Sequence, residues 1–400
     1  MMGDPLLQLV EKRLQSSLVL QVLNSSSNTE STCNSSTKSP PPLTNLNTPD
    51  GSPVVHLFEI SSELDKTLNW RGNSHNQKFV VITLNGSIMV YDTMFRRVLW
   101  KTQTNLERLS WGEFICEKEE STSSSLLIYS RQSGLYQIQL QEEEDEQEHP
   151  PQPQLIPSET HVGFCKPYLS KTNQNLIVPI ETDKIGLYAI GQGQNQPEIS
   201  TCFTFSSTVM SLKEITNDED EEGSKYVMVT TEDGFVNVLK CEKDDSTSGW
   251  KGVLVSKLIL PNQSQGICIE EDETTSIFVI GTNLKAIYLL KWTLKENILQ
   301  PVGKKLLPTE GVSCLALQKG EGDKLLGAGC FDGTIRLFSF PKMTQISSIS
   351  YHTSQINTLL FISEKVVKKN SKVGNGKTFL LCGASNSGSL SVWNAPALPI

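Results

Sequence analysis

Short apolar runs of four to eight residues recur along the chain, separated by polar or glycine-containing turns. Several runs alternate apolar and polar positions, which is typical of strands with one buried face. A period of about 50 residues emerges when the runs are aligned on the turn or small residue before the third run of each unit, at Gly86, Gly134, Lys184, Gly234, Leu284, Gly333 and Gly388. A fixed period of this size predicts a repeat architecture, and units of short strands without a helical pattern favour a β-propeller.

The repeats predict an all-β fold, a single seven-bladed propeller with four strands in each complete blade. In the first unit the strands are expected at 54–60, 79–84, 87–92 and 97–102, with a tight Asn85-Gly86 turn between the second and third. The first strand of the third blade is expected at 162–165. The predicted blades cover residues 54–104, 105–150, 160–200, 201–262, 263–308, 309–352 and 353–394.

The seventh blade lacks an outer strand, because the sequence ends shortly after its third strand. We expect the apolar segment 17–23 to supply the missing strand and close the ring, which would remove two open sheet edges. The alternative is an amphipathic helix over 6–23, since Leu6, Leu9, Val10 and Leu14 lie near one helical face. The Ser-, Asn- and Pro-rich stretch 24–53 is predicted to be a disordered insertion.

Composition and charge narrow the class of partner. The 400 residues carry a formal net charge of −9, which argues against direct nucleic-acid binding. No apolar run approaches the roughly 20 residues of a spanning helix, and the first five residues do not begin a secretory signal, so no membrane partner is expected. The nine cysteines are dispersed without a CxxC pair, which favours a reducing intracellular compartment.

Three charged segments fall at expected loop positions. The acidic segments are 141–153 and 218–222, and the basic segment is 365–372. Solvated loops are the simplest interpretation of all three, because loops tolerate insertions and charge. The basic segment also fits a nuclear-import signal or a patch for an acidic partner.

A search for catalytic and metal-binding patterns predicts no catalytic, cofactor-binding or metal-ligating residue. The chain has no GxSxG elbow, Walker loop or dinucleotide fingerprint, and none of its five histidines pairs with another at helical spacing. The stretch from Asp218 to Glu222 opens like a calcium loop, but the twelfth position is Val229 instead of a bidentate glutamate. We therefore expect a non-enzymatic protein without a cofactor or small-molecule substrate.

The ends of three predicted third strands, at 90–92, 337–339 and 392–394, resemble the Trp-Asp ending of WD repeats. In that family a loop His, a second-strand Ser or Thr, a turn Asp and the Trp form a hydrogen-bonded network within a blade. Blade seven keeps His352 and Trp393 but has Ser387 at the Asp position, and blade six keeps Asp332 but has Phe338 at the Trp position. The repeats are degenerate, and His352 is expected to be structural.

The chain also resembles the ASTRA-associated WD-repeat family of fungi, which is related to vertebrate G-protein-beta-like proteins. The matching stretches are 91–100, Val-Gly-Phe-Cys-Lys-Pro at 162–167, 331–361 and 379–394, whereas the long insertion near the N-terminus departs from the family. The resemblance implies a nuclear scaffold subunit of the ASTRA complex, linked to chromatin remodelling and to maturation of phosphatidylinositol-3-kinase-related kinases. Its partners would be ASTRA subunits, including the kinase-maturation co-chaperones.

Two other classes of function fit a propeller of this kind. One is a signalling module resembling a G-protein beta subunit, which would need a long N-terminal coiled-coil helix, and 6–14 is too short for three heptads. The other is a substrate receptor of a ubiquitin ligase, for which the repeats themselves carry no signature. An enzyme is the least supported class, because paired acid and base groups are missing.

Overall fold

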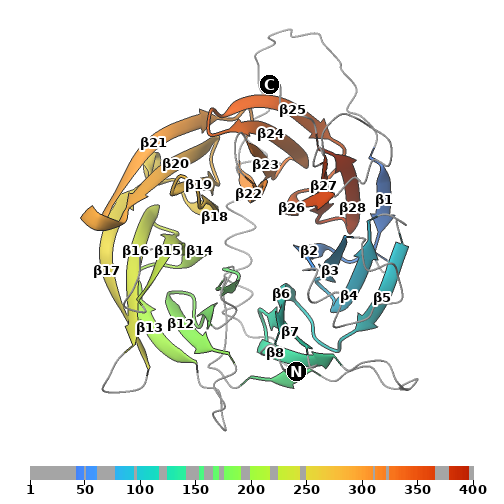
Figure 1. Ribbon diagram of the computed structural model, residues 1–400, viewed down its shortest axis with the longest axis horizontal. Coiled ribbons are helices and arrows are strands. Elements are labelled where there is room, and N and C mark those ends of the chain that lie inside the picture. The colour runs from blue at the N-terminus through green and yellow to red at the C-terminus, as the bar shows by residue number, and fades with distance from the viewer. Residues whose placement is uncertain are drawn as a thin grey trace, which may run out of the picture. The chain divides into compact units, whose positions relative to one another are not determined.

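Seven four-stranded antiparallel sheets make up the structured part of the protein (Figure 1). The structure, a computed structural model, describes residues 42–48, 51–60, 77–93, 97–116, 124–140, 153–156, 165–170, 175–190, 199–216, 224–243, 249–309, 311–320, 324–364 and 378–395. All of these residues belong to one compact unit, 39–400. The seven-bladed β-propeller predicted from the repeats is confirmed.

The blades are numbered from the first complete sheet in the chain, and within each blade the strands are named in hydrogen-bonding order. Blade 1 contains β2 (Val54–Glu59), β3 (Lys78–Thr83), β4 (Ser87–Asp92) and β5 (Arg97–Gln103). Blade 2 contains β6 (Leu109–Cys116), β7 (Ser124–Ser130), β8 (Gly134–Leu140) and β9 (Gln154–Leu155). Blade 3 contains β10 (Tyr168–Leu169), β11 (Asn175–Pro179), β12 (Lys184–Ala189) and β13 (Ser200–Thr204).

Blades 4 to 7 follow the same order, except that the last blade takes a strand from the other end of the chain. Blade 4 contains β14 (Val209–Ile215), β15 (Lys225–Thr231), β16 (Phe235–Lys243) and β17 (Trp250–Ile259). Blade 5 contains β18 (Gly266–Asp272), β19 (Ile277–Thr282), β20 (Ala286–Thr293) and β21 (Ile298–Leu306). Blade 6 contains β22 (Val312–Leu317), β23 (Lys324–Cys330), β24 (Thr334–Phe340) and β25 (Thr344–Ser350), and blade 7 contains β26 (Ile356–Glu364), β27 (Thr378–Ser385), β28 (Ser389–Asn394) and β1 (Thr44–Asn47).

We call the seven residues on which the repeats were aligned the anchor residues. They lie at the turns before the third strands. Gly86 precedes β4 and Gly333 precedes β24, with φ angles of 88° and 80° that side-chain-bearing residues rarely adopt. A Cβ atom at Gly333 would lie 2.4 Å from the carbonyl oxygen of His352, so this turn also packs against the loop entering the next blade. Glycine is required there for both conformation and space.

The ring is closed by an N-terminal strand, but the strand is not the one expected. β1 pairs antiparallel with β28, from Thr44 opposite Val392 to Asn47 opposite Ser389. It occupies the place assigned to 17–23, which lie outside the described residues, and it falls within the stretch 24–53 predicted to be disordered. That stretch is too polar to read as a strand, yet an edge strand needs only its backbone to pair.

Two predicted blade boundaries and the position of one predicted strand differ from the structure. β9 pairs with β8, so blade 2 extends beyond residue 150, and β13 pairs with β12, so blade 3 extends beyond residue 200. The first described strand of blade 3 is Tyr168–Leu169; of the expected 162–165, residues 162–164 lie outside the described residues and Cys165 is in no strand. Strands of two residues are too short to show alternation, so sequence periodicity cannot locate them.

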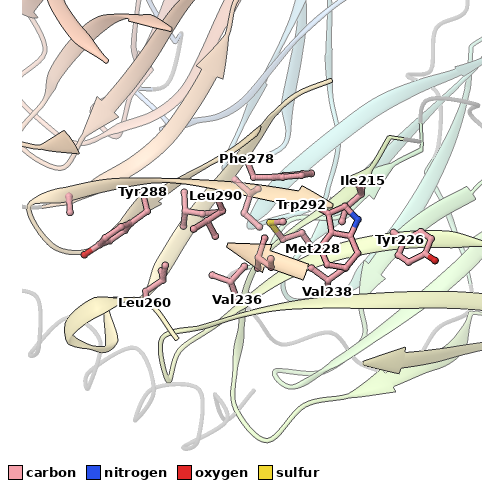
Figure 2. Packing of buried hydrophobic residues seen from close by; sticks show 14 residues of the cluster. Ile215, Tyr226, Met228, Val236, Val238, Leu260, Phe278, Tyr288, Leu290 and Trp292 are labelled. Atoms are coloured by element: carbon pink, nitrogen blue, oxygen red, sulfur yellow. The ribbon is translucent and has the colours of Figure 1, made fainter. Parts of the chain in front are cut away.

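The hydrophobic core consists of clusters that fill the spaces between neighbouring blades. Figure 2 shows the cluster shared by blades 4 and 5, where Met228 and Val238 of blade 4 meet Phe278 and Leu290 of blade 5. Fully burying one large aliphatic or aromatic side chain contributes about 1.5–3 kcal/mol. Apolar packing between blades is therefore the main source of stability in the ring.

Blades 7 and 1 meet at the closing strand. Leu46 of β1 packs against the cluster shared by these blades, and an apolar cavity of about 80 Å³ lies beside it. The cavity is lined by Leu46, Asn47, Thr48, Val54, Val81, Met89, Tyr91, Val98 and Leu390. Val98, one of its lining residues, is exposed, so the cavity opens toward the surface between blades 7 and 1.

Candidate functional site: the inner strands of the ring

The first strand of each blade faces the centre of the ring and contacts the first strand of at least one neighbouring blade (Figure 1). Because every blade repeats the same topology, the C-terminal ends of these inner strands lie on one face of the ring. Several of these ends carry charged side chains, namely Glu59, Glu113, Lys213, Glu214, Glu270, Glu271 and Asp272. No sequence pattern predicted this charged inner face.

Blades 4 and 5 are linked on this face by an ion pair and by hydrogen bonds. Lys213 Nζ lies 3.0 Å from Glu270 Oε2, and the backbone N–H and hydroxyl of Thr216 each donate to Glu271 at 3.1 Å. Burial alone would lower the pKa of Lys213, but the carboxylate of Glu270 raises it above the ordinary lysine value. The ion pair of Lys213 with Glu270 therefore joins two blades.

Blades 5 and 6 are joined in the same way. The buried ammonium of Lys324 bonds to Asp272, which also accepts hydrogen bonds from Thr274 at 3.0 Å and Thr275 at 2.6 Å. Burial would raise the pKa of Asp272, yet these hydrogen bonds hold it below the usual range. Breaking one partner of such a buried pair is costly, because the remaining charge stays buried.

Glu113 and Glu59 have a different environment on blades 2 and 1. Burial raises the pKa of Glu113 to about 8, opposed in part by Lys319. Burial likewise raises the pKa of Glu59, again opposed by Lys319. A protonated carboxyl donates a hydrogen bond where a carboxylate can only accept. Glu113 is therefore largely neutral at pH 7 and can act as a donor.

Lys166 links two blades that are not adjacent. Its Nζ donates a hydrogen bond of 2.9 Å to the carbonyl oxygen of Val55 on β2, so the entry to blade 3 contacts blade 1. Burial and the nearby Arg131 lower the pKa of Lys166 to about 8. Burial and the charge of Lys166 also lower the pKa of His56. This lysine belongs to the 162–167 stretch that carries the family resemblance, of which 165–167 are described.

The histidine expected to be structural does lie inside blade 7, with a different partner. His352 Nε2 is 2.6 Å from Ser391 Oγ, and Ser391 donates to the carbonyl of Gly383 at 3.2 Å. Ser387, at the expected Asp position, instead lies 3.0 Å from Ser385. Burial lowers the pKa of His352 to about 4, so the ring is neutral at physiological pH.

A polar residue recurs at the same place in four third strands. Gln137, Asn237, Arg336 and Ser391 all stand three positions after the anchor residue of their blade. Gln137 donates to Ser125 at 2.9 Å, and Arg336 donates to both Asp332 and Thr309 at 2.9 Å. Asp332, expected from the WD pattern, thus pairs with an arginine instead of a histidine. The contacts of this polar residue differ from blade to blade, and in the other three blades the position is apolar: Met89, Leu187 and Ile287.

The arrangement is suited to holding blades together and presenting a surface. Among the described residues, no group of three or more His, Cys, Asp or Glu side chains could hold a metal ion. Within the same part of the chain, no helix has the length and apolar character to cross a membrane. The seven cysteines whose side chains the structure describes are free thiols, and burial raises the pKa of Cys314 to about 12 and that of Cys330 to about 11.

The fold and this geometry define a seven-bladed β-propeller. No protein-family model matches the chain, and no curated protein matches its sequence. Among solved structures, Sqt1 of Saccharomyces cerevisiae superposes with a TM-score of 0.52 at 14% identity, covering 80% of this chain and 81% of Sqt1. BBS1N, solved in complex with ARL6DN, gives a TM-score of 0.57 at 12% identity, covering 87% of this chain and 94% of BBS1N. Identities this low show a shared fold alone.

Proposed function

We propose that this protein is a non-enzymatic scaffold that binds other proteins, as a subunit of the ASTRA complex. The observation that supports this proposal is that charged side chains of the inner face pair with one another between blades. Lys213 pairs with Glu270, and Lys324 pairs with Asp272. Charged groups that satisfy each other hold a rigid ring and leave its faces and rim for contact. Propellers of this type bind partners by burying surface without chemistry.

The assignment to ASTRA rests on the family resemblance of four stretches, one of which supplies Lys166. In this role the protein acts in the nucleus, with chromatin-remodelling subunits and the co-chaperones that mature phosphatidylinositol-3-kinase-related kinases. With a formal net charge of −9, its contact with chromatin is indirect and runs through protein partners. It has no membrane or small-molecule partner in this role.

Affinity purification of the tagged protein from its native cell, followed by mass spectrometry, tests the proposal. Recovery of kinase-maturation co-chaperones and remodelling subunits is the expected result. An unrelated WD-repeat protein from the same cell, tagged identically, is the control for proteins that bind any propeller. Recovery of cullins would assign the protein to ubiquitin-ligase receptors, and recovery of gamma-like subunits would assign it to signalling modules.

A further inference from the structure

The outer strands of blades 4 and 5 expose large aliphatic side chains. Val253 on β17 is 46% exposed, and Val302 and Leu306 on β21 are 47% and 67% exposed. Further exposed aliphatic residues on the same two strands are Leu254, Ile259 and Ile298. The two strands contact each other and lie side by side at the rim of the ring (Figure 1). Exposed apolar surface concentrated on adjacent elements marks interaction sites more often than scattered single residues do.

Strand register shows which of these side chains border the space between the two blades. Directly opposed residues of an antiparallel pair point to the same face of the sheet. Lys304 is opposite Tyr288 and Leu306 is opposite Ala286, and both partners belong to the cluster between blades 4 and 5. Lys304 and Leu306 therefore face blade 4.

The same reasoning places residues of β17. Leu254 is opposite Leu239, which belongs to the cluster between blades 3 and 4, so the adjacent Val253 faces the other way, toward blade 5. Lys251 lies two positions before Val253 on the same strand and therefore also faces blade 5. Leu258 packs against the blade 4–5 cluster, whose buried residues are shown in Figure 2. We call the surface formed by Lys251, Val253, Leu258, Pro301, Lys304 and Leu306 the blade 4–5 seam.

The charge of the blade 4–5 seam is opposite to that of the protein. Of the four lysines on β17 and β21, Lys251 and Lys304 belong to the seam, and neither strand carries an acidic residue, in a chain of net charge −9. Lys304 Nζ lies 5.3 Å from the centroid of the Tyr288 ring, so its aliphatic stem covers apolar surface while its charge stays at the rim. Glu242, opposite Lys251, lies 2.5 Å from Lys240 and is already paired. The seam therefore keeps an excess of positive charge beside aliphatic side chains.

We propose that the blade 4–5 seam binds an extended segment of a partner protein that combines acidic and aliphatic side chains. β17 has ten residues and β21 has nine, so the seam offers the length of a strand-like segment. Pro301 has no N–H to offer, and a bulge interrupts each strand, at Val255 and at Val302. The segment is consequently held by its side chains and not by a continuous backbone ladder.

A peptide ligand fits this surface better than an anionic membrane does. The exposed large apolar side chains of β17 and β21 are all aliphatic, whereas membrane-surface elements present aromatic side chains at the interface. The proposal rests on the scaffold role proposed above and assigns that scaffold one partner-binding surface, the blade 4–5 seam. Because its test uses purified components, failure here is separable from failure of the ASTRA assignment.

Fluorescence anisotropy with the purified full chain tests the proposal. The probe is a labelled peptide of about ten residues in which glutamate alternates with leucine, matched in length to β17. We expect saturable binding at low salt and at least a tenfold loss of affinity in two double variants, Lys251→Glu with Lys304→Glu and Val253→Ser with Leu306→Ser. The matched control is Val98→Ser with Lys101→Glu on β5, another outer strand with an exposed aliphatic residue and an exposed lysine, and it should bind like the unmodified chain.

Circular dichroism establishes that each variant is folded before binding is compared. Absence of binding at about 1 mM peptide would overturn the proposal, since that concentration corresponds to the weakest contact of interest. Equal losses in the β5 control, or unchanged binding of a glutamate–serine peptide, would reduce the effect to general charge attraction. Binding to phosphatidylserine vesicles that is lost in the seam variants, without peptide binding, would reassign the surface to membranes.

Discussion

Lys166 and Val55 are joined by a hydrogen bond of 2.9 Å that passes blade 2 and ties the entry of blade 3 to the inner strand of blade 1. The ion pairs of Lys213 and Lys324, in contrast, connect successive blades. The Lys166 hydrogen bond instead connects two blades that are not neighbours. Its ammonium group sits close to the guanidinium of Arg131, and burial together with that charge lowers the pKa of Lys166 to about 8.

Replacing Lys166 by Met should change how stability depends on pH. In the intact protein the pKa of Lys166 is about 8 when folded and near 10.5 when unfolded, so the unfolded chain holds the proton more tightly between these values. Its contribution to the free energy of unfolding therefore rises as pH increases from 8 toward 10.5. Urea denaturation across this range should show that rise in the intact chain and a flatter profile in Lys166→Met. The exposed Lys101→Met on β5 should keep the original profile.

Glu113 should make the free energy of unfolding fall as pH rises, which is the opposite of the effect of Lys166 and occurs at lower pH. Its folded pKa of about 8 lies above the ordinary value of 4.5, so the folded state holds the proton more tightly. The contribution of this residue to the free energy of unfolding is complete below pH 4.5 and is lost as pH rises to 8. Glu113→Gln should consequently be more stable than the intact chain at pH 8. Equal stability at pH 8, with the exposed Glu107→Gln as reference, would mean that water solvates this carboxyl fully.

His352 should make blade 7 sensitive to acid. Its pKa is lowered to about 4 by burial, so the unfolded chain takes up a proton first as pH falls below 6.5. The free energy of unfolding should decrease by at most about 1.4 kcal/mol per pH unit between 6.5 and 4. Guanidinium denaturation of His352→Phe should lack this component, and Ser391→Ala should retain it. At pH 7 the loss of the bond to Ser391 should cost about 1 kcal/mol.

Leu46 should decide whether β1 closes the ring. It packs on the blade 7–1 cluster and lines the apolar cavity, so a carboxylate at this position would be partly desolvated. Leu46→Asp should lower the free energy of unfolding by about 2 kcal/mol. Asn45→Asp, at an exposed neighbouring position of the same strand, is the matched control and should leave the melting temperature nearly unchanged. Equal effects of the two variants would contradict a closing role for the Leu46 side chain.

The described thiols should react slowly while the protein is folded. Six of the seven are buried, and burial raises the pKa of Cys314 to about 12, so thiolate is scarce at pH 8. In a Cys33→Ser, Cys116→Ser background, which removes the other two cysteines of the chain, Ellman's reagent should label the folded protein slowly. Labelling should become rapid in denaturant. Fast stoichiometric labelling without denaturant would show that the blade interfaces open readily.

The third strands were predictable because two signals coincide in them. Gly86 and Gly333 mark turns that need positive φ, and the residues after them alternate or are continuously apolar. β1 was not predictable, since Thr44–Asn47 contains a single apolar residue and pairs through its backbone. Composition assigned it to disorder for that reason.

Most of the contacts that the polar residues make within and between blades could not be predicted from the sequence. Lys166 and Val55 are 111 positions apart, and no periodic pattern links them. The partner of His352 was not predicted either, because Ser391 lies in the third strand, whereas the WD pattern directs attention to the turn. A systematic comparison of the third position after each anchor would have found Arg336 and Ser391. It would not have shown what they contact.

The pairing of β1 with β28 also sets an order in time. Asn45 and Ser389, whose side chains lie 3.3 Å apart, are separated by 344 positions. At about 5–20 residues per second, a ribosome adds the second of them roughly 20–70 s after the first. Throughout that interval β1 is unpaired while the six blades between it and blade 7 are being made. Synthesis itself therefore creates a period in which the backbone edge of β1 and the side chain of Leu46 are available to chaperones or to misassembly. That period ends when β28 has been made and pairs with β1.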